Sequence, residues 1–331
     1  MKKSLLICSA VLIFFNLALA AEEKTSSVTI EPFTSIKYGK LGEYVYDTDS
    51  NGDLQKLSYL EWEVKPLVLA GLNASAKTKN ITIAYNFLSY GVPLSSGNMY
   101  DSDWMALTDM KTNYSISENT LNHFLQAGCN VNYTFKTNTI ISITPGAGFD
   151  FSSISFSARN GYGWYGDYER STTHENISWN SPYAKYYASG ELMGIDYSRE
   201  TFYTWLGFSA NADFNKYFSL SFSAYISPYT FVSSIDKHFS NSTSTVYTAY
   251  NDLMDCYFSY FKTSLASEVN FSKNFSLCLN VNCLIGESAI GITYSKYVTP
   301  TYEGTKSLLS SKSKSDTFEL EASLSCRIRF F

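Results

Sequence analysis

Residues 125–135 read Leu-Gln-Ala-Gly-Cys-Asn-Val-Asn-Tyr-Thr-Phe, so apolar and small or polar side chains alternate along the whole stretch. The same alternation recurs in residues 275–285 and again in residues 318–330. Side chains of an extended chain point to opposite faces with period 2, so each stretch has one apolar and one polar face. This pattern predicts strands that contact lipid on one side and a wet interior on the other.

The alternation extends over ten segments. They are residues 26–43, 56–74, 79–91, 119–136, 139–158, 185–214, 216–236, 252–272, 275–297 and 314–331. Short turns alternate with long polar connections, which fall at 44–55, 92–118, 159–184, 239–251 and 298–313. An even number of strands joined by turns of alternating length is typical of outer-membrane barrels. We therefore predict an all-β fold, a ten-stranded antiparallel transmembrane β-barrel that forms one domain over residues 21–331.

The first twenty residues have the pattern of an export signal. Lys2 and Lys3 precede an apolar run, and residues 18–20 read Ala-Leu-Ala, a small-x-small cleavage site. The apolar run is short for a membrane-spanning helix, which needs about 20 residues. We expect residues 1–20 to be a cleaved signal peptide.

The composition excludes one large class of function. The chain of 331 residues holds 25 basic and 30 acidic side chains, a net charge of −5, so nucleic acid is not an expected partner. Its 27 Tyr and 23 Phe side chains, with only 17% charged residues, suit a barrel whose outer face meets lipid.

Two short clusters of ionisable residues are far apart in sequence. One holds Asp101 and Asp103, in the second long connection. The other holds Asp236 and His238, where the seventh strand leads into the fourth long connection. Both clusters are expected at the same end of the barrel. A carboxylate bonded to an imidazole orients it and raises its basicity, so the ring can take a proton from water. No Gly-x-Ser-x-Gly nucleophile pattern is present, and no metal or organic cofactor is expected.

The phase of the seventh strand requires an irregularity. Phe218, Phe222 and Ile226 belong to its apolar phase, which would place Asp236 and His238 on the outer face if it continued unbroken. Pro228 interrupts the strand, and proline in a sheet is tolerated at bulges, where one extra residue inverts the phase. We predict a bulge near Pro228 that turns Asp236 and His238 inward.

Five strings of residues together resemble a known family. They are residues 42–46 (Gly-Glu-Tyr-Val-Tyr), 57–62 (Leu-Ser-Tyr-Leu-Glu-Trp), 98–105 (Asn-Met-Tyr-Asp-Ser-Asp-Trp-Met), 156–161 (Phe-Ser-Ala-Arg-Asn-Gly) and 236–238 (Asp-Lys-His). In content and order they resemble the omptins, ten-stranded outer-membrane endoproteases. The resemblance implies that Asp101 and Asp103 form an aspartate couple, that Asp236 orients His238, and that the attacking water lies between the two pairs.

The resemblance also implies a substrate pocket. Glu43 matches the acidic residue that receives the basic side chain before the scissile bond, and Met99 and Met193 match apolar pocket walls. A second acid is usual two places before the aspartate of the dyad, but this chain has Ser234, so recognition of Arg or Lys should weaken or change. At the family's lipopolysaccharide-binding strand the acid and base are absent, since Phe149, Phe151 and Ser153 stand there.

These observations predict an outer-membrane endopeptidase of the aspartic type whose active site faces outward. Its expected partners are peptide or protein substrates and outer-membrane lipid. The alternative is a catalytically inactive barrel that acts as an adhesin or structural protein.

Overall fold

The computed structural model of the chain describes residues 26–91, 95–107, 109–137, 140–167, 176–240 and 244–331. The expected signal peptide, residues 1–20, lies outside these ranges. No helix in the described ranges has the length and apolar character needed to cross a bilayer.

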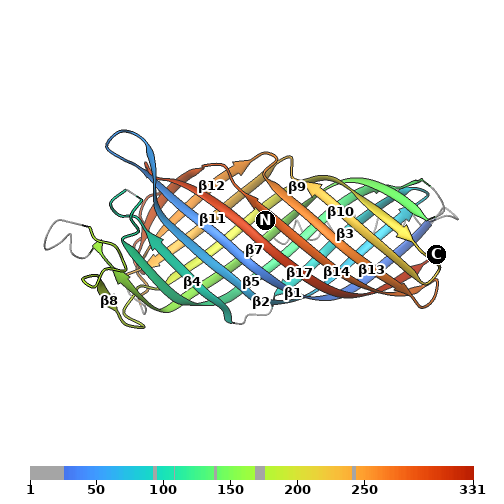
Figure 1. Cartoon of the computed structure of the whole chain (residues 1–331), viewed down its shortest axis with the longest axis horizontal. Coiled ribbons are helices and arrows are strands. Elements are labelled where there is room, and N and C mark those ends of the chain that lie inside the picture. Colours follow the sequence, from blue (N-terminus) through green and yellow to red (C-terminus); the bar gives the residue numbers. More distant parts are fainter. Residues whose placement is uncertain (1–25, 92–94, 108, 138–139, 168–175, 241–243) are drawn as a thin grey trace.

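The β-elements join into one closed antiparallel sheet that forms a ring of ten strands (Figure 1). Six elements each supply one strand of the ring: β1 (Ser26–Thr48), β2 (Leu54–Thr78), β5 (Asn113–Tyr133), β7 (Ile141–Tyr165), β9 (Ile195–Asp213) and β17 (Lys312–Phe330). The other four strands are each built from two consecutive elements: β3 (Ile81–Gly91) with β4 (Ser95–Asp103), β10 (Phe218–Ile226) with β11 (Thr230–Phe239), β12 (Tyr247–Cys256) with β13 (Tyr260–Asn270), and β14 (Phe275–Glu287) with β15 (Ile292–Val298). The short elements β6 (Phe135–Lys136), β8 (Lys185–Tyr187) and β16 (Ser307–Leu308) pair with the ends of the long strands.

The ring closes between its first and last strands. β1 pairs with β17 from Val28↔Phe330 to Tyr46↔Lys312, and it pairs with β2 along its other edge. Closure leaves no open edge of the sheet, which is what a β-structure needs in lipid. The predicted fold class is therefore confirmed.

One predicted connection is wrong. Residues 92–118 were expected to form a long loop that carries Asp101 and Asp103, but β4 continues the third strand through both residues and β5 begins at Asn113. Asp101 pairs with Leu60 of β2 on one side and with Ser115 of β5 on the other. Because both neighbouring strands satisfy the backbone of β4, its polar side chains do not prevent strand formation.

The outer face changes character along the barrel. Towards the end with short turns it is apolar, and Ile36, Phe149, Leu206 and Leu279 are exposed there. These residues alternate with side chains that line the interior, so they point towards lipid. This half is the membrane-spanning part, with the apolar band that such barrels require.

Towards the end with long loops the outer face is polar. Lys40 binds Glu61 at 2.6 Å, and Arg159 binds Asp196 at 2.7 Å. Lys40 alternates with buried Leu41, so its side chain points outward. We call this part of the wall the polar collar, and because such pairs favour water over hydrocarbon it lies outside the membrane-spanning part. In Figure 1 the long-loop end, with β8, is at the left.

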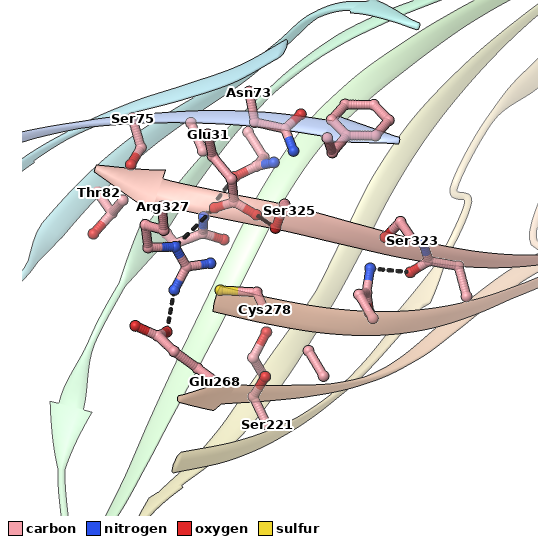
Figure 2. Close-up of a pocket in the computed structure, with 18 of the residues that line it drawn as sticks. Glu31, Asn73, Ser75, Thr82, Ser221, Glu268, Cys278, Ser323, Ser325 and Arg327 are labelled. Atoms are coloured by element: carbon pink, nitrogen blue, oxygen red, sulfur yellow. Dashed lines mark hydrogen bonds and ion pairs between the residues drawn. The ribbon is translucent and has the colours of Figure 1, made fainter. Parts of the chain in front are cut away.

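The interior of the membrane-spanning half is polar and holds a cavity of about 730 Å³. Lys37 Nζ lies 2.8 Å from Glu319, and Lys262 Nζ lies 2.8 Å from Asp150. Figure 2 shows Arg327 between the carboxylates of Glu31 and Glu268 in this cavity. Pairing of this kind offsets the cost of enclosing charges in a barrel.

An apolar layer separates this cavity from the long-loop end. Trp62 is fully buried and stacks on Phe156 and Tyr197, with ring centroids 5.8 and 5.0 Å apart. The layer is completed by buried side chains of β1, β2, β4, β5, β7 and β9: Leu41, Leu60, Val64, Leu67, Leu69, Met99, Leu121, Phe124, Ile154, Ala158 and Ile195. It forms the floor beneath the ionisable residues described next.

Candidate active site

The first carboxyl pair lies on β4. Asp101 and Asp103 are two residues apart on one strand, so both side chains share a face, and both are partly buried. Ser58 Oγ donates to Asp101 Oδ1 at 3.4 Å, and Asn113 Nδ2 donates to Asp103 Oδ2 at 3.4 Å. Neutral donors of the two neighbouring strands thus hold both carboxyls.

The second pair reaches the interior through an irregularity at Pro228. Along β10, Ile226 pairs with Leu206 of β9, whereas Thr230 of β11 pairs with Tyr203. Between these two pairs the seventh strand advances by four residues while its neighbour advances by three, so the seventh strand contains one extra residue. Phe222 is exposed in β10 but Phe231 is exposed in β11, so the phase inverts between them. The predicted bulge is confirmed, and Asp236 and His238 face the interior.

Asp236 and His238 are bonded to each other. Asp236 Oδ2 accepts a hydrogen bond from His238 Nε2, and the side chain of Asp236 is only 4% exposed. The imidazole is 28% exposed, and Tyr250 meets it edge-on with ring centroids 5.3 Å apart. The carboxylate fixes the orientation of the ring, while the ring itself remains partly exposed.

The charges of the two pairs act on each other. Burial alone would lower the pKa of His238, but the negative charges of Asp236, Asp101 and Asp103 outweigh it and raise the pKa to about 9. Burial raises the pKa of Asp101 well above its usual range, with a further contribution from Asp103, and burial also raises the pKa of Asp103. The structure thus brings all four residues, from β4 and β11, to one place within the polar collar.

The residues expected to line the pocket lie in different surroundings. Glu43 and Ser234 are each 1% exposed, and Ser234 shares the inner face of β11 with Asp236. Met99 belongs to the apolar layer beneath Asp101. Met193 is exposed in the segment before β9, next to Gly194, whose carbonyl accepts the backbone N–H of Phe239. Met99 is thus buried and Met193 exposed, and their expected part in a substrate pocket stays a prediction.

Sequence reasoning missed two buried ionisable residues of this region. Asp252 of β12 is the cross-strand partner of Ser234, and its Oδ2 accepts from Ser234 Oγ at 3.3 Å. Arg199 of β9 donates to Asp316 O at 2.9 Å and to Thr317 Oγ1 at 2.7 Å. Only the register of the strands identifies Asp252, because no local motif marks it. Among the described residues, no group of three or more His, Cys, Asp or Glu side chains is arranged to hold a metal ion.

Comparison with protein families gives one assignment. The sequence model of the omptin family matches residues 24–305, which is most of the chain. The chain belongs to the omptin family. The resemblance drawn from the five strings of residues is therefore confirmed, and this omptin has the fold expected for an outer-membrane β-barrel.

One solved structure supports the fold. The outer membrane protease OmpT from Escherichia coli matches with a TM-score of 0.74 and 17% identity, covering 93% of this chain and 98% of that chain. The autotransporter NalP translocator domain from Neisseria meningitidis has a TM-score of 0.32 and 8% identity, covering 97% and 96% of the two chains. OprG from Pseudomonas aeruginosa has a TM-score of 0.33 and 10% identity, covering 92% and 96%. A search of curated proteins returned no match.

Proposed function

We propose that this omptin is an endopeptidase that hydrolyses peptide bonds with a water activated between the two pairs. The observation that carries the proposal is the convergence of Asp101 and Asp103 with the Asp236–His238 pair on the inner face within the polar collar. We further propose that the long-loop end faces the cell exterior, so the substrates are peptides or proteins outside the cell.

The proposed reaction needs no covalent intermediate with the protein. A water held by Asp101, with Asp103 in support, adds its oxygen to the carbonyl carbon of the scissile bond while His238 takes a proton from it. Asp236 orients the imidazole and stabilises the charge that forms. His238 then gives the proton to the leaving nitrogen as the carbon–nitrogen bond breaks, which restores the base.

The protonation of His238 sets a condition on this reaction. With a pKa of about 9, the resting imidazole is mostly protonated at neutral pH and its basic form grows as the pH rises. A cationic substrate bound among the carboxylates would oppose their charge and so lower the pKa of His238. A positively charged side chain near the scissile bond therefore favours the active form of the base.

The test is cleavage of a mixed peptide library by refolded barrel, with and without added outer-membrane lipid. We expect cleavage by the wild type and none by the Asp101→Ala, His238→Ala double variant. The matched control is Asp109→Ala, His123→Ala, because Asp109 is an exposed loop residue and His123 lies further along β5 than Asn113, the residue that binds Asp103. Folded wild-type barrel that cleaves nothing under either condition would contradict the proposal and favour the inactive adhesin or structural barrel.

A further inference from the structure

The four short turns at the end opposite the long loops carry basic residues without acidic ones. Each turn has at least one lysine, and none has an Asp or Glu. The lysines are Lys77 and Lys79 in residues 76–80, Lys136 in residues 135–139, Lys216 in residues 214–217 and Lys273 in residues 271–274. We call these turns the basic rim, which lies at the right in Figure 1, beside the C-terminus. Because the whole chain has a net charge of −5, the rim differs in sign from the protein that carries it.

Two neighbouring turns of the basic rim have the same construction. They read Phe-Asn-Lys-Tyr-Phe (residues 214–218) and Phe-Ser-Lys-Asn-Phe (residues 271–275). In each turn the second residue, Asn215 or Ser272, accepts the two backbone N–H groups that follow the lysine. The turns are neighbours because β10, which follows the first turn, pairs with β13, which precedes the second. Each lysine therefore occupies the tip of an ordered turn.

The phenylalanines on either side of each lysine mark the membrane boundary. The rings of Phe214 and Phe218 have centroids 5.8 Å apart, and so do those of Phe271 and Phe275. All four rings are exposed, at the end of the outward phase that includes Phe222. Aromatic rings are enriched where a barrel wall passes from hydrocarbon to headgroups. The lysines at the tips of the two turns are then at the level of the headgroups.

A cavity of about 480 Å³ is lined from both turns. Lys216 and Lys273 line it from the turns, and Asn270 and Arg329 line it from the strand ends. The guanidinium of Arg329 already binds the carboxylate of Glu268 and also donates to Asn270 Oδ1 at 3.3 Å. The uncompensated charge of the cavity therefore comes from the two lysines.

Neither of these lysines has a counter-ion in the protein. Among the residues that the structure describes, no carboxylate forms an ion pair with Lys216 or Lys273. Lys216 Nζ lies over the ring of Tyr217, 4.8 Å from its centroid. Asp213, the acidic residue nearest to Lys216 in sequence, lines the interior cavity of the barrel instead. Two ammonium groups at one cavity give it a positive potential that favours an anion.

We propose that this cavity binds the phosphate of an anionic phospholipid in the leaflet around the short-turn end. The headgroup contacts Lys216 and Lys273, while the acyl chains lie along the exposed apolar face that Phe218 and Val269 form below the turns. Each lysine near a membrane surface adds to the attraction for anionic lipid. A zwitterionic headgroup binds less well, because its own cation meets the two ammonium groups.

The site is separate from those discussed above. It does not include residues 149–153, where the resemblance places the family's contact with lipopolysaccharide. It lies at the opposite end of the barrel from the Asp236–His238 pair, and the proposal does not rest on peptide hydrolysis.

The test measures lipid bound to refolded barrel in detergent by native mass spectrometry. The probes are dioleoyl phosphatidylglycerol, dioleoyl phosphatidylcholine with the same acyl chains, and inorganic phosphate as the free anion. We expect the wild type to bind phosphatidylglycerol about 10- to 30-fold more tightly than phosphatidylcholine. Inorganic phosphate at the same concentration should not displace the lipid, because it lacks the apolar contacts.

Three double variants locate the site. Lys216→Gln, Lys273→Gln should weaken binding of phosphatidylglycerol by about 10- to 30-fold, to the level of phosphatidylcholine. Lys216→Arg, Lys273→Arg keeps both charges and should bind like the wild type. The matched control, Lys77→Gln, Lys79→Gln, removes the same charge from another turn of the basic rim and should keep the binding. The heat-dependent shift on gels confirms that each variant is folded.

The outcomes that overturn the proposal are specific. Equal weakening by the two pairs of Gln substitutions would show that the basic rim attracts lipid diffusely, without a site at this cavity. Equal affinity of the wild type for the two lipids, or displacement of the lipid by phosphate, would contradict an anionic phospholipid as the ligand. None of these results bears on peptide hydrolysis, so the two proposals fail independently.

Discussion

At His238 two opposing effects set the protonation state of the imidazole. Burial favours the neutral ring, while three carboxyl groups from two strands favour the charged ring, and the carboxyl groups prevail with a pKa of about 9. The partial exposure of the ring lets it meet both water and substrate. The same charges that make His238 a strong base also keep it protonated at neutral pH.

The first prediction concerns the pH dependence of cleavage. Since the base must be neutral, kcat/KM of the wild type should rise with pH towards about 9, following the pKa of His238. Asp236→Asn removes the largest charge that raises this pKa, so the rise should move to lower pH. The maximal rate should fall by about 10²- to 10⁴-fold, because the ring loses the carboxylate that orients it. A pH–rate profile of both proteins checks this, and an unmoved profile would refute the role of Asp236.

The second prediction concerns the stability cost of Glu43. Its raised pKa means that the folded protein holds a proton that the unfolded chain releases, so the stability it contributes is present below the usual pKa of glutamate and is lost as the pH rises. Glu43→Gln removes this dependence and should stabilise the barrel by about 1–3 kcal/mol at pH 8, with little gain at pH 4. Urea unfolding at both pH values measures it. Glu200→Gln, an exposed carboxyl on β9, is the control and should change little.

At the scale of a strand, the decisive element is the junction of β10 and β11. Ser227 N donates to Tyr260 O, and Thr204 N donates to Tyr229 O, so backbone bonds anchor the extra residue on both sides. β10 presents its even-numbered apolar residues to lipid, and β11 presents its even-numbered polar residues to the interior. One strand can thus contact lipid along β10 and carry site residues on the inner face of β11, because its phase inverts between the two elements.

The third prediction tests this inversion. Deletion of Pro228 removes the extra residue, which should turn Asp236 and His238 to the outer face and abolish cleavage. Pro228→Ala keeps the residue count and should retain cleavage at close to the wild-type rate. Peptide cleavage and the heat-dependent shift of the folded barrel on gels are measured for both variants. A folded deletion variant with normal cleavage would contradict the assignment of the phase.

At the scale of the whole molecule, the barrel is a stack of three environments. A polar cavity with internal ion pairs lies within the membrane-spanning half, the apolar layer lies above it, and the ionisable residues of the candidate site lie beyond that layer towards the long-loop end. The apolar layer separates this cavity from the site, where burial lowers the local dielectric and strengthens the interactions of the charged groups.

The fourth prediction concerns this layer. Trp62→Ala removes the ring that stacks on Phe156 and Tyr197 and should destabilise the barrel by about 3–5 kcal/mol. Unfolding in urea measures the loss. Tyr183→Ala, a highly exposed aromatic residue in the connection before β8, is the control and should leave stability within about 0.5 kcal/mol of the wild type. Equal effects of the two substitutions would show that the layer does not carry the stability assigned to it.

The sequence by itself determined the features that depend on local order. Period-2 alternation gives the strands because a side chain's face follows from its parity along the chain. The same parity revealed the conflict at Pro228 and hence the bulge, and the string around Asp101 and Asp103 marked one half of the site. The sequence misjudged β4, because residues 98–103, which include Asn98, Asp101, Ser102 and Asp103, look like a loop when their neighbours in the sheet are unknown.

Only the tertiary structure decided that Asp252 lies beside Ser234 and Glu43. Ser234 and Asp252 are 18 residues apart, and Glu43 lies on a strand that joins the ring by its closure. Such contacts depend on the register between strands and on closure of the ring, and a shift of one residue would turn every side chain of a strand to the other face. That is why the couple of Asp101 and Asp103 could be found by its pattern, whereas Asp252 emerged only once β12 was placed beside β11.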